Sequence, residues 1–203
     1  SGLVLFRTPN TVAAIEHHAE YIIRKGSKDL GATSLEGSRS GAALLIHAGL
    51  HIIGRQGYEL LIDQGIEKAQ YFARLVTNDS NFELISKPEL NILTYRLVPE
   101  SVAVTLKYAD DTGRQTINEQ LNRLTVLIQK TQRQRGKTFV SRTTLKPVVY
   151  GKKEITVFRV VLANPLTNQA ILQQVLEEQK LIAQEAEAQT IIDEILCPPS
   201  QFA

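Results

Sequence analysis

The sequence is poor in the residues that build disulfide or metal-bound scaffolds. Its 203 residues contain one cysteine, Cys197, and neither methionine nor tryptophan. A single cysteine excludes an internal disulfide, so a reducing compartment, the cytoplasm, is expected. A net charge of +2 lacks the basic excess that is typical of nucleic-acid or membrane-surface binding. Because even the initiator methionine is missing, we expect a processed chain or one part of a longer protein.

Long apolar runs are also missing. The longest, Ala42–Gly54, is interrupted by His47 and His51 and is too short to span a bilayer. The chain does not open with the basic and apolar regions of a signal peptide. What is present is ordinary globular composition, with 43% hydrophobic and 22% charged residues. This length predicts one generous domain or two small ones.

The first part of the chain predicts one strand followed by helices. A short apolar run at Gly2–Phe6 favours a buried strand. Gly54 and Gly57 are expected to break the helical pattern. Helices are predicted over Val12–Arg24, Ala42–Ile53 and Tyr58–Val76.

After Ser80 the pattern changes to strands in pairs, each pair followed by a helix. Asp110–Gly113 and Gly151–Lys153 are predicted turns. This ββ–α–ββ–α order predicts an antiparallel sheet with helices on one face. The strands are expected over Phe82–Ile85, Asn91–Val98, Thr138–Leu145 and Ile155–Leu162, and the helices over Ile117–Gln134 and from Thr167 or Asn168 to about Glu187.

Two histidine pairs and one basic cluster could carry chemistry. His47 and His51 are spaced to share a helix face, but the sequence offers neither the neighbouring glutamate nor a third ligand of a zinc site, so no metal is expected. His17–His18 could transfer protons or lie on a surface. A solvated helix face explains the cluster better than nucleic-acid binding. Its members are Arg123, Lys130, Arg133, Arg135 and Lys137.

Two further features point to anionic ligands. Glu36–Gly41 (EGSRSG) places glycines, hydroxyls and a guanidinium before a helix, which suits a phosphate or carboxylate, although a capped helix start would look the same. Arg159 lies inside the apolar strand Val157–Leu162, where a buried arginine would need a carboxylate partner. That carboxylate could belong to the protein or to a ligand.

Taken together, these segments resemble the C-terminal part of the group II pyridoxal-phosphate-dependent amino-acid decarboxylases. The resemblance runs from Gly2 to about Glu187. It rests on the order and spacing of several motifs. These are Gly2–Phe6, Glu36–Ala42, Gly54–Tyr58, Phe82–Leu84 with Pro88 and Asn91–Tyr95, and Phe158–Pro165.

The resemblance implies an α/β with α+β fold class, the C-terminal portion of a type I pyridoxal-phosphate-dependent transferase fold. Residues 1–53 would be a remnant of the large cofactor-binding domain, and residues 54–203 a linking helix and a small antiparallel-sheet-plus-helices domain. The cofactor would be pyridoxal 5'-phosphate, in a homodimer. The family's Schiff-base lysine follows a histidine, and no such pair occurs here. The chain is therefore expected to be inactive by itself.

The resemblance also implies roles for four residues. Ser38 would contact the cofactor phosphate, with Arg39 beside it. Tyr21 would correspond to the tyrosine that returns a proton to Cα after carbon dioxide leaves. Arg159 would hold the substrate carboxylate, which resolves the open question of its partner towards a ligand.

The implied activity is release of carbon dioxide from an L-amino acid. Phe139–Leu145 and Leu162–Thr167 look most like the L-2,4-diaminobutyrate branch. Glutamate and aromatic amino acids are alternative substrates. A lyase or aminotransferase of the same cofactor, and a non-catalytic α+β dimerisation module, are alternative functions.

Overall fold

The computed structural model describes residues 4–16, 30–33 and 41–197, and the chain divides into two compact units, Ser1–Tyr58 and Glu59–Ala203. Within these described ranges no helix has the length and apolar character needed to cross a membrane.

The first unit contains two short 3₁₀ helices, η1 (Pro9–Ile15) and η2 (Leu30–Thr33), and the first part of α1 (Ala42–Asn78). The predicted strand at Gly2–Phe6 is wrong for residues 4–6, because the described part of this unit offers no strand to pair with. The predicted helix from Val12 is 3₁₀ up to Ile15, and its remaining residues from 17 onward lie outside the described ranges.

Helix α1 contains the break predicted at Gly54. The backbone there has φ 72° and ψ 174°, a conformation that is essentially restricted to glycine. The break predicted at Gly57 is wrong, because that residue continues the helix.

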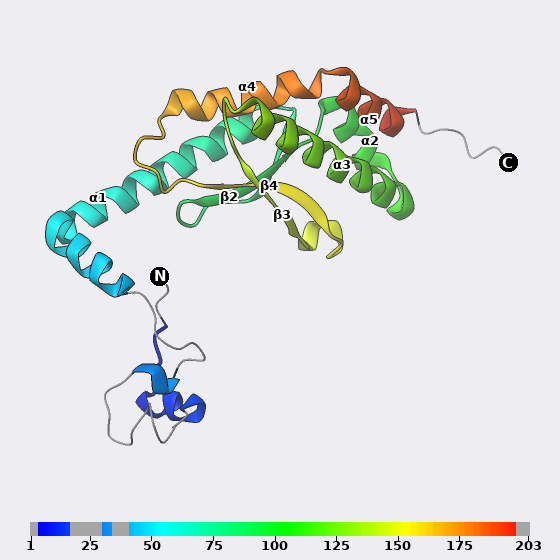
Figure 1. The fold of residues 1–203 in the computed structure, drawn as a ribbon. Coiled ribbons are helices and arrows are strands. Elements are labelled where there is room, and N and C mark those ends of the chain that lie inside the picture. Colours follow the sequence, from blue (N-terminus) through cyan, green and yellow to red (C-terminus); the bar gives the residue numbers. More distant parts are fainter. Residues whose placement is uncertain (1–3, 17–29, 34–40, 198–203) are drawn as a thin grey trace. The chain divides into compact units, whose positions relative to one another are not determined.

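The second unit is built on a four-stranded antiparallel sheet in the order β1-β2-β4-β3. Its strands are β1 (Phe82–Ser86), β2 (Ile92–Leu97), β3 (Ser141–Leu145) and β4 (Ile155–Val161). Figure 1 shows the part of α1 that belongs to this unit, from Glu59 onward, on the same side of the sheet as α3 and α4. The predicted layer of strands with helices on one face is therefore confirmed.

The helices of this unit differ from the predicted ones at their ends. Asp110 is the N-cap of α3, where its carboxylate accepts from the Gly113 amide at 2.7 Å, so the predicted turn is the start of a helix. The predicted final helix ends at Ala183 and a further helix follows. The helices are α2 (Glu100–Tyr108), α3 (Asp111–Arg135), α4 (Gln169–Ala183) and α5 (Ala186–Leu196), with the 3₁₀ turn η3 (Val148–Tyr150) before β4.

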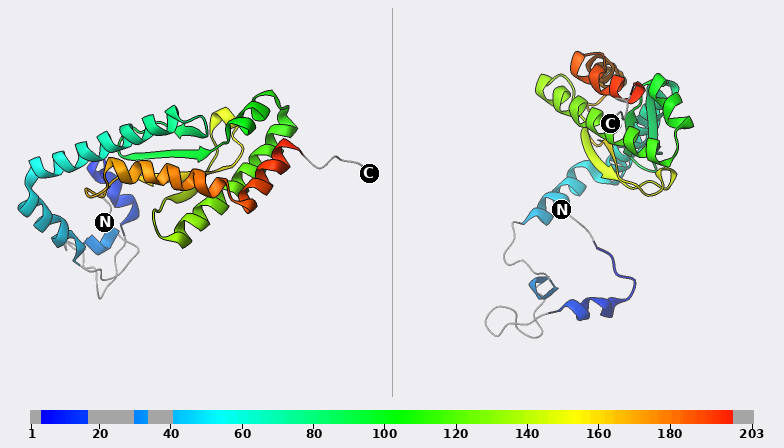
Figure 2. Two further views of the ribbon diagram at one scale, coloured as in Figure 1. Left: turned by 90° about the horizontal axis from the view of Figure 1, so that it is seen from above. Right: turned by 90° about the vertical axis from the view of Figure 1, so that its right-hand side faces the viewer.

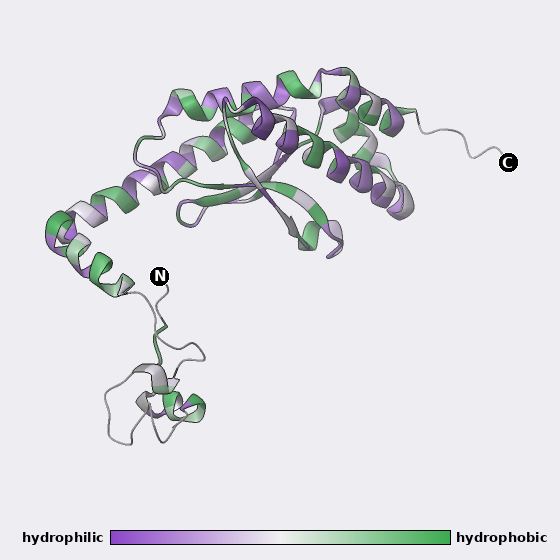
Figure 3. Cartoon of the chain, in the orientation of Figure 1, coloured by the Kyte–Doolittle hydropathy of each residue, from purple (hydrophilic) through white to green (hydrophobic). Residues whose placement is uncertain are grey.

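The core is centred on Tyr95 of β2. Its ring lies 5.3 Å from Phe72, 5.9 Å from Phe82 and 5.2 Å from Phe158, all between ring centroids. Such tilted and edge-on contacts suit the charge distribution of aromatic rings. Figure 3 shows that α3 is largely hydrophilic, so only a stripe of it joins this core. That stripe consists of Ile117, Leu121, Leu124 and Ile128.

A chain of buried polar groups crosses this core. The Tyr95 hydroxyl donates to Gln179 Oε1 at 3.0 Å, and Gln179 Nε2 donates to Gln132 Oε1 at 3.3 Å. Gln132 Nε2 then donates to Thr138 Oγ1 at 2.6 Å, and that hydroxyl donates to Glu178. These bonds link β2, α3 and α4 through groups that would be costly to bury alone.

The second part of α1 runs alongside α4 (Figure 2) and meets the segment that follows β4. A Cβ on Gly65 would lie 2.9 Å from the Leu162 carbonyl oxygen, so only glycine allows this approach. Lys68 Nζ donates to the carbonyls of Asn164 at 3.3 Å and Pro165 at 2.9 Å. These contacts fix the loop that follows Arg159.

Candidate functional site

Arg159 is the one predicted site residue that the described structure places. Tyr21, Ser38 and Arg39 lie outside the described residues, as does the pair His17–His18. The geometry of the candidate site is therefore that of Arg159 and its neighbours in the sheet.

The Arg159 side chain is exposed, so the expectation of a buried guanidinium is wrong. Its strand neighbours Phe158 and Val160 face the apolar core, and strand alternation directs Arg159 to the other face. Of the apolar residues around it, Phe158 and Val160 lie on the helix-covered face of β4. Val157 and Val161 alternate onto the face of Arg159, where Val157 is buried and Val161 is exposed. They do not form a pocket around Arg159.

Arg159 belongs to a polar row that crosses all four strands. Ser86 pairs with Thr94, Thr94 pairs with Arg159, and Arg159 pairs with Ser141. The Ser86 and Thr94 hydroxyls are 2.7 Å apart, and the Ser141 hydroxyl donates to the Arg159 carbonyl at 2.6 Å. The row thus presents a guanidinium between hydroxyl groups, all held by the sheet.

In the described part of the chain, no carboxylate pairs with the Arg159 guanidinium. An unpaired guanidinium on a rigid strand can bind a ligand carboxylate through two parallel N–H···O bonds. An exposed Arg159 can therefore still bind an anionic partner, although burial does not require one.

Arg96 is a structural charge that the sequence argument missed. Its side chain is 0% exposed, and it donates to Glu83 Oε2 at 2.8 Å, Asn118 Oδ1 at 2.8 Å and the Tyr150 hydroxyl at 2.6 Å. Its guanidinium carbon also lies 4.5 Å from the centre of the Tyr150 ring. The Tyr150 hydroxyl donates in turn to Glu83. The alternation of side chains along β2 was the available signal for Arg96. It predicts that Arg96 lies on the sheet face opposite Tyr95, but it does not predict the partners of Arg96.

Burial shapes the proton affinities of two tyrosines. Burial raises the pKa of Tyr95, and the hydrogen bond to Gln179 offsets only part of this rise. Burial also raises the pKa of Tyr150, and the Arg96 charge opposes the rise. Both hydroxyls are therefore neutral hydrogen-bond donors at physiological pH.

The other charged candidates have structural partners or lack further ligands. Arg123 pairs with Glu194 at 3.0 Å and Arg135 pairs with Glu185, so part of the basic cluster is neutralised on the surface. The rings of His47 and His51 lie 4.4 Å apart between centroids. Across the described ranges, no group of three or more His, Cys, Asp or Glu residues is arranged to hold a metal ion.

Comparison with known proteins gives matches in both sequence and fold. Residues 2–98 match the model of the pyridoxal-dependent decarboxylase conserved domain. The chain is similar to mouse CSAD in its apo form, with 21% identity and a TM-score of 0.66 over 87% of this chain and 35% of that one. The fold is that of the C-terminal domain of a type I pyridoxal-phosphate enzyme, which confirms the predicted fold class.

Two further relatives extend the comparison. The chain is 56% identical over 187 residues to an aspartate 1-decarboxylase of Aliivibrio fischeri, covering 92% of this chain and 34% of that protein. It is also similar to the glutamate decarboxylase domain of diaminobutyrate-pyruvate transaminase and L-2,4-diaminobutyrate decarboxylase from Vibrio parahaemolyticus. That likeness has 19% identity and a TM-score of 0.51, over 70% of this chain and 25% of that one.

These matches support the pyridoxal-dependent decarboxylase family for this chain, and with it pyridoxal phosphate as the cofactor. The chain spans about a third of the length of the Aliivibrio fischeri relative.

Proposed function

We propose that this chain is the C-terminal part of a pyridoxal-phosphate-dependent decarboxylase that releases carbon dioxide from an L-amino acid. The observation that carries the proposal is the unpaired Arg159 guanidinium, held in a polar row of a sheet with this family's fold. The 56% identity to an aspartate 1-decarboxylase supports the same activity.

The cofactor, when bound, supplies the electron-accepting ring that makes loss of a carboxylate feasible. In this proposal Arg159 holds the substrate carboxylate and orients it, Ser38 and Arg39 hold the cofactor phosphate, and Tyr21 returns a proton to Cα. The Schiff-base lysine would come from a segment outside this chain. The intact protein would be a cytoplasmic homodimer, and the chain alone would be inactive.

We propose L-aspartate as the substrate, because the 56% identical relative is an aspartate 1-decarboxylase. L-2,4-Diaminobutyrate is the second candidate, supported by the motifs at Phe139–Leu145 and Leu162–Thr167. The two substrates carry side chains of opposite charge, so a pocket that suits one should reject the other. Measuring carbon dioxide release from each amino acid with the full-length protein separates the candidates. If neither amino acid releases carbon dioxide, glutamate and aromatic amino acids are the next substrates to test. Release from none of these would favour a non-catalytic module or another reaction of the cofactor.

Arg159→Lys in the full-length enzyme tests the site. Lysine keeps the charge but loses the two-pronged geometry, so kcat/KM should fall by a factor that corresponds to about 2–4 kcal/mol. KM should rise together with this fall, while cofactor absorbance and thermal stability stay unchanged. Arg142→Lys is a matched control, because Arg142 pairs with the core-facing Phe158 and its guanidinium donates to Gln129. If kcat/KM stays within a few-fold of the parent value, Arg159 is a surface residue that does not bind the substrate.

A further inference from the structure

A cleft of about 770 Å³ lies in the second unit, and no residue of the Arg159 row lines it. Its walls come from β1, α2, the first turns of α3 and the η3 turn. Ligand sites in proteins usually enclose about 300–1,000 Å³, so this cleft has the size of a small-molecule site. It is lined by Ser80, Phe82, Glu83, Val98, Ala103, Leu106, Lys107, Asp111, Arg114, Gln115, Asn118, Val149, Tyr150, Gly151 and Lys153.

The charges around the cleft do not balance. Lys107, Arg114 and Lys153 line it, and in the part of the chain that the structure describes no carboxylate pairs with any of them. The carboxylates in the lining are Glu83, which Arg96 neutralises from beneath, and Asp111 in the first turn of α3. The cleft therefore carries excess positive charge.

Two of these cations are held in place by neutral partners. Arg114 donates through Nε to the Ala109 carbonyl at 3.0 Å and through Nη2 to the Lys107 carbonyl at 3.3 Å. Lys153 Nζ donates to Gln115 Oε1 at 3.0 Å. Neutral partners leave the positive charges uncompensated, while they fix where those charges lie.

The other lining residues either supply apolar surface or are held in place by hydrogen bonds to Arg96. Phe82, Val98 and Leu106 line the apolar side. Asn118 and Tyr150 line the floor, where both are bonded to the buried Arg96 guanidinium. A floor fixed by a buried charge network does not collapse into the cleft.

We propose that this cleft binds a small organic anion, whose charged group meets Lys107, Arg114 and Lys153 and whose apolar body lies on the Phe82 wall. An apolar body distinguishes this ligand from inorganic phosphate, and the excess of cations distinguishes it from a neutral metabolite. Because Arg159 does not line the cleft, binding can be tested in the absence of substrate.

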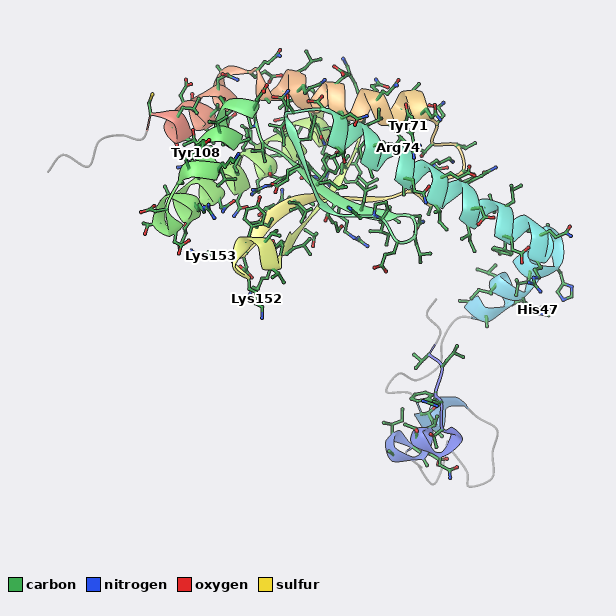
Figure 4. The ribbon with its side chains drawn as sticks, turned by 180° about the vertical axis from the view of Figure 1, so that it is seen from behind. His47, Tyr71, Arg74, Tyr108, Lys152 and Lys153 are labelled. Atoms are coloured by element: carbon green, nitrogen blue, oxygen red, sulfur yellow. The ribbon has the colours of Figure 1, made fainter. Side chains whose placement is uncertain are left out.

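The test is a fluorescence titration of the full-length protein with 8-anilino-1-naphthalenesulfonate, which combines an aromatic body with one negative charge. In the double variant Lys107→Gln/Lys153→Gln the dissociation constant should rise about five- to ten-fold. Lys152→Gln is the matched control, because Lys152 adjoins Lys153 on the same turn (Figure 4) but does not line the cleft. The uncharged N-phenyl-1-naphthylamine should bind the parent and the double variant equally.

A second measurement locates the probe. The sulfonate should slow acetylation of Lys153, followed by mass spectrometry, and leave that of Lys152 unchanged. The proposal is overturned if the double variant binds the sulfonate like the parent, if the uncharged probe loses affinity equally, or if Lys153 is not protected. A cleft covered by other parts of the full-length protein would give this last result.

Discussion

Among single residues, Arg96 shows how one buried charge can connect several elements. It lies on β2, and its partners Glu83, Asn118 and Tyr150 lie on β1, α3 and η3. Desolvating a guanidinium costs several kcal/mol, which the fold recovers only when every bond is made. The network is therefore sensitive to the loss of any member.

Arg96→Met should destabilise the second unit by about 3 kcal/mol, because Glu83 loses its ion-pair partner, and Asn118 Oδ1 and the Tyr150 hydroxyl lose their donor. Hydrogen exchange of the β2 amides measures this local free energy of opening in the full-length protein. Arg133→Met is the control, since Arg133 is exposed on α3. Equal opening free energies in the two variants would show that the Arg96 network contributes nothing to stability.

The ion pair between Lys180 and Asp79, with a distance of 3.0 Å, gives a pH-dependent prediction. Burial opposes ionisation of Asp79, but hydrogen bonds from Asn81 and Lys180 outweigh it and lower the pKa of that carboxyl below 3.8. The hydrogen bonds to Glu177 and Asp79 raise the pKa of Lys180 above 10.5. Both groups are therefore charged, and the ion pair stabilises the fold, at pH values between the lowered pKa of Asp79 and the raised pKa of Lys180.

Asp79→Asn should lower the opening free energy of the second unit by about 1 kcal/mol at pH 7. A lowered folded-state pKa contributes stability above the unfolded value and loses it as the pH falls through the folded value. The difference between variant and parent should thus shrink below pH 3.8. The exposed Asp63 supplies the control Asp63→Asn, which should have no such effect. A difference that persists unchanged at pH 3 would argue against the ion pair.

The direction of a single side chain was predictable where it depends only on the alternation of residues along a strand. The direction of Arg159 relative to Phe158 followed from strand alternation, but its exposure depends on which sheet face the helices cover. The role of Arg96 could not be predicted, because its partner Tyr150 is 54 residues away in the sequence.

Among the elements, strands and long helices were predictable because they repeat a simple pattern. Helix α2 was missed, since the β-branched Val102, Val104 and Thr105 obscure a short helix that follows Pro99. The end of α4 was also missed, because the chain turns at Gln184 without glycine or proline. Here tertiary packing, rather than a local signal, decides where the helix stops.

Gly54→Ala should cost about 1–3 kcal/mol, because an alanine side chain is strained at the φ and ψ of this break in α1. Thermal unfolding of the full-length protein measures the loss, and we expect a lower midpoint for the first transition. Gly41→Ala is the matched control, because an added Cβ there has nothing within 4 Å and its φ is not positive. If both variants unfold like the parent, the break at Gly54 imposes no strain in solution.

On the scale of the whole molecule, the two units differ in how they bury apolar side chains. The second unit has a continuous core that includes residues of α1, β2, α3, α4 and α5. In the first unit, helix α1 exposes large apolar side chains. These are Leu44, Leu45, Ile46, Leu50, Ile52 and Ile53. The second unit has its own core, so the opening of its hydrogen bonds should not depend on the cofactor. The first part of α1, which follows Ser38 in the sequence, should depend on it.

Removing pyridoxal phosphate from the full-length enzyme should therefore change amide exchange in the first unit but not in the second. Amides of Ala42–Ile53 should exchange faster, because the proposed phosphate contacts Ser38 and Arg39 immediately precede this helix. Amides of β2 and α3 should exchange at unchanged rates, since their hydrogen bonds and core contacts lie within the second unit. Hydrogen exchange with mass spectrometry, with and without added cofactor, resolves both regions in one sample. Equal acceleration in both would show that the second unit depends on the cofactor for its stability, and no acceleration in either would remove Ser38 and Arg39 from the cofactor site.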